Sequence, residues 1–347
     1  MARLRRVDCS GPGITRRRRG RGFEYRDDAG RRIADGEVLA RIRELAIPPA
    51  WKDVWVCPYP NGHLQATGTD AAGRKQYRYH DEWRARRDQE KFDAMLDFAA
   101  TLPRMRRRVR RDLRGKDLDR TRVLACATRL LDLGFFRIGG EDYAEENDSY
   151  GLATLLKRHV RLEDQAIVFD YEAKSGKRRV QEITDPAVRE VIAALKRRRG
   201  GGRELLAHRD GRRWVDVRSE DINEYVKGAT ASQHSAKDFR TWNATVLAAV
   251  ALAGRDVPGT KAGRQRAIRA AIEAVATLLG NTPAVCRSSY IDPRVIDRYR
   301  SGWTIGPALE DLGGAPELAN EATRAQVESA VLDLIREDDS PALARAA

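Results

Sequence analysis

The spacing of apolar residues changes near Trp83, and this change limits the fold class more than any other feature of the 347-residue sequence. Residues 22–80 consist of short alternating segments separated by turn signals such as Pro-Asn-Gly and Ala-Ala-Gly, a pattern typical of β-hairpins. Beyond Trp83, apolar residues recur at helical spacing, as at Phe92, Met95 and Ala99. The sequence therefore predicts an α+β fold, in which a small β-rich N-terminal domain precedes a larger, mainly α-helical domain.

The pattern inside each part refines this prediction. A helix near residues 37–46 interrupts the strands, and Pro103 is placed to open a helix that carries a thin apolar stripe. Residues 166–183 differ from their helical surroundings, because they alternate as two strands around the turn Lys-Ser-Gly-Lys. An isolated hairpin of this kind is a candidate functional element. Further helices are expected at residues 186–199, 218–229, 235–252 and 262–279.

Charge is distributed unevenly along the chain. There are 65 Lys and Arg residues against 51 Asp and Glu, which gives a formal net charge of +14. Residues 305–347 have nine acidic and three basic residues, a net charge of −6, so residues 1–304 carry +20. Arginine clusters at residues 16–22 and 104–111 suit phosphate groups, because guanidinium forms paired hydrogen bonds with their oxygens. The charge favours a polyanionic partner, most simply nucleic acid, with a soluble enzyme of highly charged surface as the alternative.

Several kinds of site are excluded because their motifs are missing. The stretch 68–75 resembles a phosphate loop, but Arg74 stands where the lysine belongs and the context is a hairpin. The five acids of residues 141–148 would point around most of a helix, and the five histidines lack zinc-ligand spacing. The four cysteines form no CxxC pair, and no run approaches the roughly 18 apolar residues of a membrane span. We therefore expect a reduced cytoplasmic protein that needs no metal, cofactor or membrane.

Metal-free phosphoryl transfer is the remaining chemistry, and suitable residues occur at isolated points. It needs fixed cations for the phosphate oxygens, an acid for the leaving alkoxide, and a nucleophile such as a tyrosine hydroxyl. Arg137 follows a helix end, Lys174 lies at the tip of the isolated hairpin, and Arg240 lies early in an otherwise apolar helix. Each alone is more often a surface charge, and Tyr290, between two expected helices, is more often a packing residue.

Five separated motifs strengthen these candidates. In chain order they are GHLQATGTDAAGRKQYRYH, LGFFRIGGEDYAEENDSYGLATL, YEAKSGKRR, KDFRTW and LGNTPAVCRSSYIDP. Together they resemble the type IB DNA topoisomerases, in the compact bacterial and poxvirus-like branch, over about residues 40–300. The resemblance implies relaxation of supercoiled DNA by transient single-strand cleavage, a 3′-phosphotyrosyl intermediate, strand rotation and religation. It also implies that neither ATP nor a metal is required.

The resemblance implies a role for each candidate catalytic residue. Arg137 and Arg240 would bind the scissile phosphate and stabilise its transition state, and Lys174 would protonate the departing 5′ oxygen. Tyr290 would attack phosphorus. In poxviral and nuclear relatives a histidine contacts the phosphate where this chain has Asn281. Its amide can still donate a hydrogen bond, but it stays neutral at every pH.

The resemblance also places the stretch GRKQYRYH in the major groove of DNA, although periodicity alone is compatible with an ordinary amphipathic strand. The residues assigned to DNA contact are Arg74, Lys75, Gln76, Tyr77, Tyr79 and Tyr143. The expected partner is double-stranded DNA. We expect a monomer that closes as a clamp around the duplex and associates with the nucleoid.

The domain prediction combines these features. The five segments are a basic N-terminal arm at 1–22, a β-rich DNA-binding domain at 23–83, a linker or helix start at 84–90, a mainly helical catalytic domain at 91–304, and an acidic helical tail at 305–347.

Two other functions compete with this interpretation. Tyrosine recombinases use nearly the same catalytic plan, but they typically carry His-x-x-Arg where this chain has Lys237 before Arg240, and their N-terminal domain is usually helical. An architectural DNA-binding protein would explain the charge but not the series of Arg, Lys, Arg and Tyr.

Overall fold

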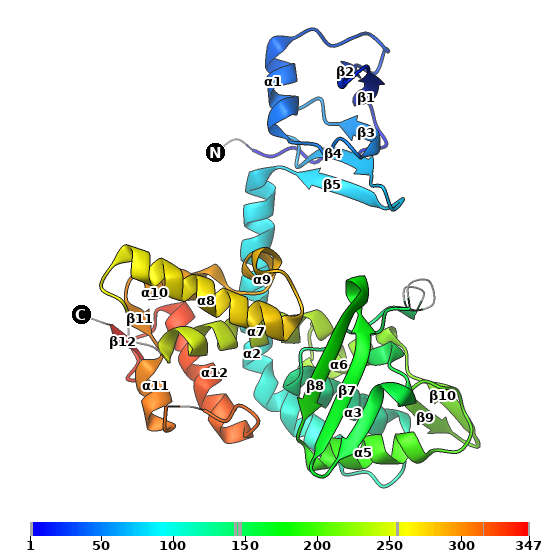
Figure 1. Ribbon diagram of the computed structural model, residues 1–347, viewed down its shortest axis with the longest axis vertical. Coiled ribbons are helices and arrows are strands. Elements are labelled where there is room, and N and C mark those ends of the chain that lie inside the picture. Colours follow the sequence, from blue (N-terminus) through cyan, green and yellow to red (C-terminus); the bar gives the residue numbers. More distant parts are fainter. Residues whose placement is uncertain (1–2, 142–143, 145–147, 255–256, 315, 346–347) are drawn as a thin grey trace. The chain divides into compact units, whose positions relative to one another are not determined.

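The computed structural model describes residues 3–141, 144, 148–254, 257–314 and 316–345 (Figure 1). The chain forms two compact units, Met1–Phe92 and Asp93–Ala347, and it passes from one to the other within helix α2 (Asp81–Leu113). The first unit is built on a β-sheet and the second mainly on helices. The predicted α+β fold is therefore confirmed.

The first unit is an antiparallel sheet of five strands in the order β2-β1-β3-β4-β5, with one helix packed against it. Its elements are β1 (Ile14–Arg19), β2 (Gly22–Arg26), α1 (Gly36–Glu44), β3 (Lys52–Val56), β4 (Leu64–Thr69) and β5 (Lys75–Tyr79). Helix α1 begins where the Asp35 side chain accepts hydrogen bonds from two backbone amides, and its Ile42 enters the core. There Ile42 meets Ile14 and Val56, so burial of apolar surface joins the helix to two strands.

Part of the expected basic arm belongs to this sheet. Residues Ile14–Arg19 form β1, which pairs with both β2 and β3. Ile14 is buried in the core, and the guanidinium of Arg16 donates to the backbone carbonyls of Pro48 and Trp51. These contacts and the pairing with β2 and β3 hold an arginine-rich segment as a strand, while Arg17, Arg18 and Arg19 stay exposed to solvent.

The second unit contains most of the helices (Figure 1). After α2 they are α3 (Arg120–Leu133), α5 (Pro186–Arg197), α6 (Ser219–Thr230), α7 (Ala236–Ala253), α8 (Lys261–Leu279), α9 (Pro283–Ser289), α10 (Pro293–Arg300), α11 (Gly306–Asp311) and α12 (Glu321–Arg336). Its strands are β6 (Val160–Glu163), β7 (Ala166–Ala173), β8 (Lys177–Ile183), β9 (Ala207–Asp210), β10 (Arg213–Asp216), β11 (Trp303–Thr304) and β12 (Ala344–Arg345). No helix in the described ranges is both long enough and apolar enough to cross a membrane.

The predicted helices and hairpin of this unit are largely confirmed. Helices α5, α6, α7 and α8 begin and end within two residues of their expected positions. The expected hairpin is β7 and β8, joined by a 3₁₀ turn at Lys174–Gly176. Strand β6 adds a third strand to this sheet, in the order β6-β7-β8, and β9 pairs with β10 in a second hairpin. Neither was predicted, so the expectation of one isolated hairpin is wrong.

The expectation that Pro103 opens a helix is wrong, because Pro103 lies inside α2. The helix continues because one buried apolar stripe extends on both sides of the proline, from Met95 and Leu102 to Met105 and Val109. Packing of this stripe compensates for the backbone hydrogen bond that proline cannot make.

The acidic C-terminal segment is packed into the second unit rather than held apart from it. The buried carboxylate of Glu328 on α12 accepts hydrogen bonds from Arg106 on α2, Trp242 on α7 and Arg324 on α12. Arg106 also forms a bidentate pair with Asp132 at 2.9 and 3.0 Å. Buried charges are tolerated only when they are paired in this way. Helix α12 therefore supports α7 within two residues of Arg240.

Candidate active site

One cavity of the second unit, of about 410 Å³, brings four of the predicted catalytic residues together. They are Arg137 after α3, Lys174 at the hairpin tip, Arg240 on α7 and Tyr290 at the end of α9. Lys237 and Tyr150 also line the cavity, and no carboxylate is among the lining residues that the structure describes. A cavity with several cations and no acid suits a phosphate group.

Three arginines meet at the carboxyl end of α8, and we call Arg137, Arg179 and Arg240 the arginine cluster. Arg179 donates to the carbonyl oxygens of residues 277 and 278 at 3.2 and 2.6 Å. Arg240 donates to that of residue 279 at 3.0 Å, and Arg137 to that of residue 280 at 3.2 Å. The last carbonyls of a helix have no partner within the helix and carry partial negative charge, so they hold guanidinium groups in place.

The arginine cluster sets the electrostatics of Tyr290. The guanidinium carbon of Arg240 lies 5.1 Å from the centre of the Tyr290 ring, and Arg240 is only 4% exposed. Burial, together with the charge of Arg137, lowers the pKa of Arg240 to about 10. Burial alone would raise the pKa of Tyr290, but the positive charges of Arg240, Arg137 and Lys237 outweigh it, so this pKa lies below its ordinary value of 10.0. The site therefore stabilises the phenolate of Tyr290 relative to a tyrosine in water.

Local helix signals fix the position of Tyr290. The Thr282 side chain caps α9, Pro283 is its first residue, and Tyr290 ends the helix. The hydroxyl of Thr245 on α7 donates to the backbone carbonyl of Tyr290 at 3.2 Å. Asp292 then caps α10. The nucleophile candidate is thus held between two helix ends and bonded to the helix that carries Arg240.

Asn281 and Lys174 each retain donors that could contact a ligand. The Asn281 side-chain oxygen accepts a hydrogen bond from Arg137 at 2.5 Å, whereas its Nδ2 is buried and has no partner in the described structure. Lys174 is exposed and makes no hydrogen bond or ion pair with a described residue. Because a buried donor without a partner is costly, the Asn281 amide fits a site that is completed by a bound acceptor. Asn281 does not itself line the cavity, but it bonds directly to an arginine that does.

The predicted DNA-contact stretch lies in the first unit, and part of it presents an exposed aromatic face. Lys75, Tyr77 and Tyr79 point to the same side of β5. The two tyrosines are 47% and 37% exposed, and their rings stack with centroids 6.1 Å apart. Lys75 lies 5.8 Å from the centre of the Tyr77 ring. Exposed tyrosines next to a lysine on a sheet edge are compatible with a nucleic-acid surface.

The other residues of this set differ in their surroundings. Arg74 forms an exposed ion pair with Asp70 at 2.9 Å, and Gln76 donates to the same carboxylate at 2.9 Å. An exposed pair of this kind is weak, about 0–1 kcal/mol, so it can open when phosphate approaches. Tyr143 lies outside the described residues.

Sequence reasoning did not select three residues that the structure places at or beside the site, Arg179, Lys237 and Tyr150. Lys237 had a signal, since it stands three residues before Arg240 in KDFR. Arg179 had none, because it follows another arginine in a run of basic residues. Tyr150 lies in a loop without periodicity, where its ring packs against His159 at 4.4 Å.

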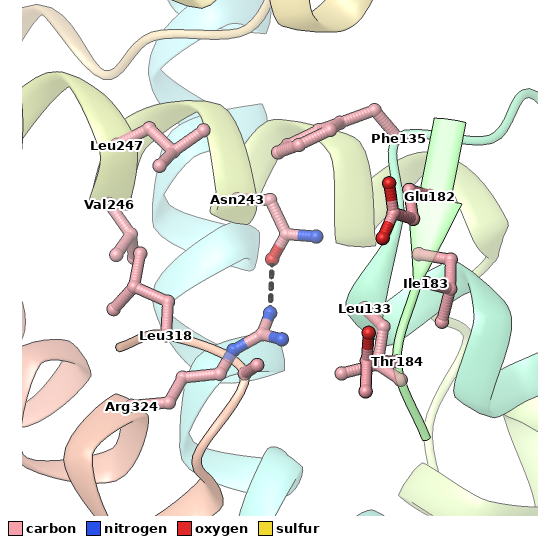
Figure 2. Close-up of a pocket in the computed structure, with 11 residues that line it drawn as sticks. Leu133, Phe135, Glu182, Ile183, Thr184, Asn243, Val246, Leu247, Leu318 and Arg324 are labelled. Carbon is pink, nitrogen blue, oxygen red and sulfur yellow. Dashed lines mark hydrogen bonds between the residues drawn. The ribbon is translucent and has the colours of Figure 1, made fainter. Parts of the chain in front are cut away.

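A second cavity, of about 210 Å³, contains none of the predicted catalytic residues (Figure 2). Its walls come from the end of α3, from β8, from α7 and from the segment that leads into α12, and most of its side chains are apolar. Asn243 and Arg324 are joined across it by a hydrogen bond of 2.8 Å. Asn243 and Arg324 are therefore already paired with each other. Within the described ranges there is also no group of three acidic, histidine or cysteine residues placed to hold a metal ion.

Comparisons with known proteins identify the family to which the chain is similar. The family model for the catalytic core of eukaryotic DNA topoisomerase I matches residues 80–302, and that for the N-terminal domain of bacterial DNA topoisomerase IB matches residues 22–70. A DNA topoisomerase 1B from Acanthamoeba polyphaga mimivirus is 30% identical over 295 residues, which cover 83% of this chain and 88% of that protein. DNA topoisomerase 1 from Candidozyma auris is 29% identical over 161 residues, 46% of this chain and 20% of that protein.

The lowered pKa of Tyr290 can be measured directly. We expect the ¹³Cζ resonance of Tyr290, assigned with Tyr290→Phe, to titrate below pH 10.0 in the wild type. In Arg240→Leu the favourable charge is lost while burial persists, so the pKa should move upward and the phenolate should form only at higher pH. Lys174→Ala should leave the titration unchanged. A wild-type pKa at or above 10.0, or no upward shift in Arg240→Leu, would contradict the assignment.

Proposed function

The chain belongs to the type IB DNA topoisomerases, and we propose that it relaxes supercoiled duplex DNA through a 3′-phosphotyrosyl intermediate at Tyr290. The observation that carries the proposal is the contact between Tyr290 and the buried guanidinium of Arg240 in a cavity lined by cations. A nucleophile with a lowered pKa, beside fixed donors, is what attack on a phosphodiester requires.

In the proposed cleavage step, the Tyr290 oxygen forms a bond to phosphorus while the bond from phosphorus to the 5′ oxygen breaks. The phenol proton leaves to solvent, and Lys174 gives a proton to the departing 5′ oxygen. Arg137 and Arg240 stabilise charge on the non-bridging oxygens, because both are held by the end of α8 before the substrate arrives. General acid catalysis by a group such as Lys174 is worth about 10²–10⁴ in rate.

Religation reverses these steps after the free strand has rotated. One phosphodiester replaces another, so the exchange is nearly isoenergetic and needs no ATP. We also propose that no metal is needed, since the arginines supply the positive charge that a divalent ion would otherwise provide.

The proposal includes a DNA-reading surface on the first unit. Strand β5 would lie in the major groove, with Gln76, Tyr77 and Tyr79 directed at bases and phosphates and Lys75 and Arg74 at the backbone. Gln is suited to the edge of adenine. Three further expectations stay predictions: the chain acts as a monomer, it closes as a clamp around the duplex, and it associates with the nucleoid.

A relaxation assay tests this function. The wild type should relax supercoiled plasmid in the presence of a metal chelator and without ATP, and Tyr290→Phe should not, because the phenyl ring lacks the attacking oxygen. Agarose gels resolve the topoisomers. Retarded but still supercoiled plasmid would indicate an architectural protein, and defined recombinant joints between two DNAs would indicate a recombinase; either result would contradict the proposal.

The rank of the phosphate donors gives a second test. Loss of one preorganised donor costs about 10²–10³ in rate, and we expect Arg137→Ala and Arg240→Ala to lose at least this much in single-turnover cleavage. Asn281→Ala should lose less, about 10-fold, because a neutral amide forms a weaker bond to phosphate than guanidinium does. A loss from Asn281→Ala equal to that of either arginine would reverse the ranking.

A further inference from the structure

We infer that Arg179, which no motif assigns, is a positioning residue that holds the Lys174 hairpin against the carboxyl end of α8. The inference rests on the proposed function, because it concerns the protonation of the 5′ oxygen by Lys174. Arg179 lies on β8, five residues beyond Lys174, and it does not line the cavity. It would therefore act through Lys174 rather than on the substrate.

The two strands of the hairpin are supported differently near its tip. Strand β7 is held there by a hydrogen bond of 2.8 Å from the Tyr150 amide to the Glu172 carbonyl, so the question is what holds β8. Strand β8 is the edge strand of the sheet β6-β7-β8, and most of its residues are exposed. Among the described residues, two β8 side chains bond to elements outside the hairpin. They are Arg179, bonded to α8, and Gln181, which accepts from the Phe135 amide. Arg179 is the closer of the two to Lys174, so its loss should affect the tip more.

The support that Arg179 provides is bidentate and closely packed. Its two terminal nitrogens donate to the carbonyl oxygens of Thr277 and Leu278, at 3.2 and 2.6 Å. Gly280, two residues after Leu278, has a φ of +65°. A Cβ atom at this position would lie 3.1 Å from the Cδ and Nη1 atoms of Arg179. Gly280 thus accommodates both the left-handed turn and the arginine stem.

The same helix end holds the residues proposed to bind phosphate. The carbonyl of residue 279 accepts from Arg240, and that of residue 280 from Arg137. Arg179 therefore places the hairpin with Lys174 relative to the same backbone segment as both phosphate-binding arginines. Arg179 does not line the cavity, whereas Arg137 and Arg240 do, which is why Arg179 is assigned to positioning and not to phosphate contact.

The test separates leaving-group protonation from the other steps. A duplex whose cleavage site has been mapped with the wild type is prepared with the natural 5′ bridging oxygen or with sulfur in its place. With sulfur, the bond from phosphorus to sulfur breaks and the thiolate departs with the electron pair, so no general acid is needed. Single-turnover formation of the covalent adduct is measured on both substrates.

We expect Arg179→Ala to cleave the oxygen substrate about 10- to 100-fold more slowly than the wild type, a part of what a general acid supplies. On the sulfur substrate its rate should be close to that of the wild type. Lys174→Ala gives the full effect of losing the acid. Arg178→Ala is the matched control, because it removes an adjacent arginine whose partner Asp170 lies within the same hairpin, at 2.7 and 2.8 Å. It should cleave both substrates nearly normally.

Two results would overturn the inference. One is an equal loss on both substrates by a folded Arg179→Ala, and the other is an Arg179→Ala that behaves like Arg178→Ala. If Arg179→Ala loses its helical circular dichroism, Arg179→Lys replaces it, because lysine keeps one of the two donor nitrogens. Arg179→Lys must then show a loss that is smaller than that of Lys174→Ala and confined to the oxygen substrate. Failure of the proposed function would look different, since the wild type itself would then form no adduct with either substrate.

Discussion

The candidate site depends on the bonds between the arginine cluster and four consecutive carbonyls, those of the last three residues of α8 and of its cap residue Gly280. Guanidinium groups repel one another when they are close and partly buried, and the lining residues described here include no carboxylate to offset them. The partial negative charge of a helix carboxyl end compensates for part of this repulsion without neutralising the cations. The site can therefore hold its positive charge ready for a phosphate, which is the condition for electrostatic preorganisation.

The need to hold three arginines at the carboxyl end of α8 accounts for the arrangement of the surrounding elements of the second unit. Helix α8 presents its carbonyls, Gly280 turns the chain, and Asn281 begins the short connection to α9 and Tyr290. Helix α7 carries Arg240 to the same carbonyls, and its own position is supported by α12 through Trp242 and Glu328. The hairpin carrying Lys174 reaches the same helix end through Arg179. Elements far apart in the sequence are thus positioned by one short stretch of backbone.

Sequence patterns of a few residues were sufficient to predict structure where neighbouring residues decide it, as at helix ends. A capping threonine and a proline begin α9, and Tyr290 lies between this helix and α10, as the sequence predicted. They were insufficient where distant groups pair. Glu328 lies in an acidic segment that suggests solvent exposure, yet its partner Arg106 is 222 residues away. In the same way, nothing local separates Arg179, which bonds to α8, from Arg178, which bonds within the hairpin.

The central claim is that this arrangement of charge makes Tyr290 the nucleophile, and one measurement tests it most directly. The wild type is mixed with a duplex that traps the cleaved strand, the covalent complex is digested with protease, and the DNA-linked peptide is sequenced by mass spectrometry. The account predicts a single peptide from the α9–α10 junction, with a 3′ phosphoryl group on Tyr290. An adduct on another residue, such as Tyr150, or a 5′ linkage would contradict it.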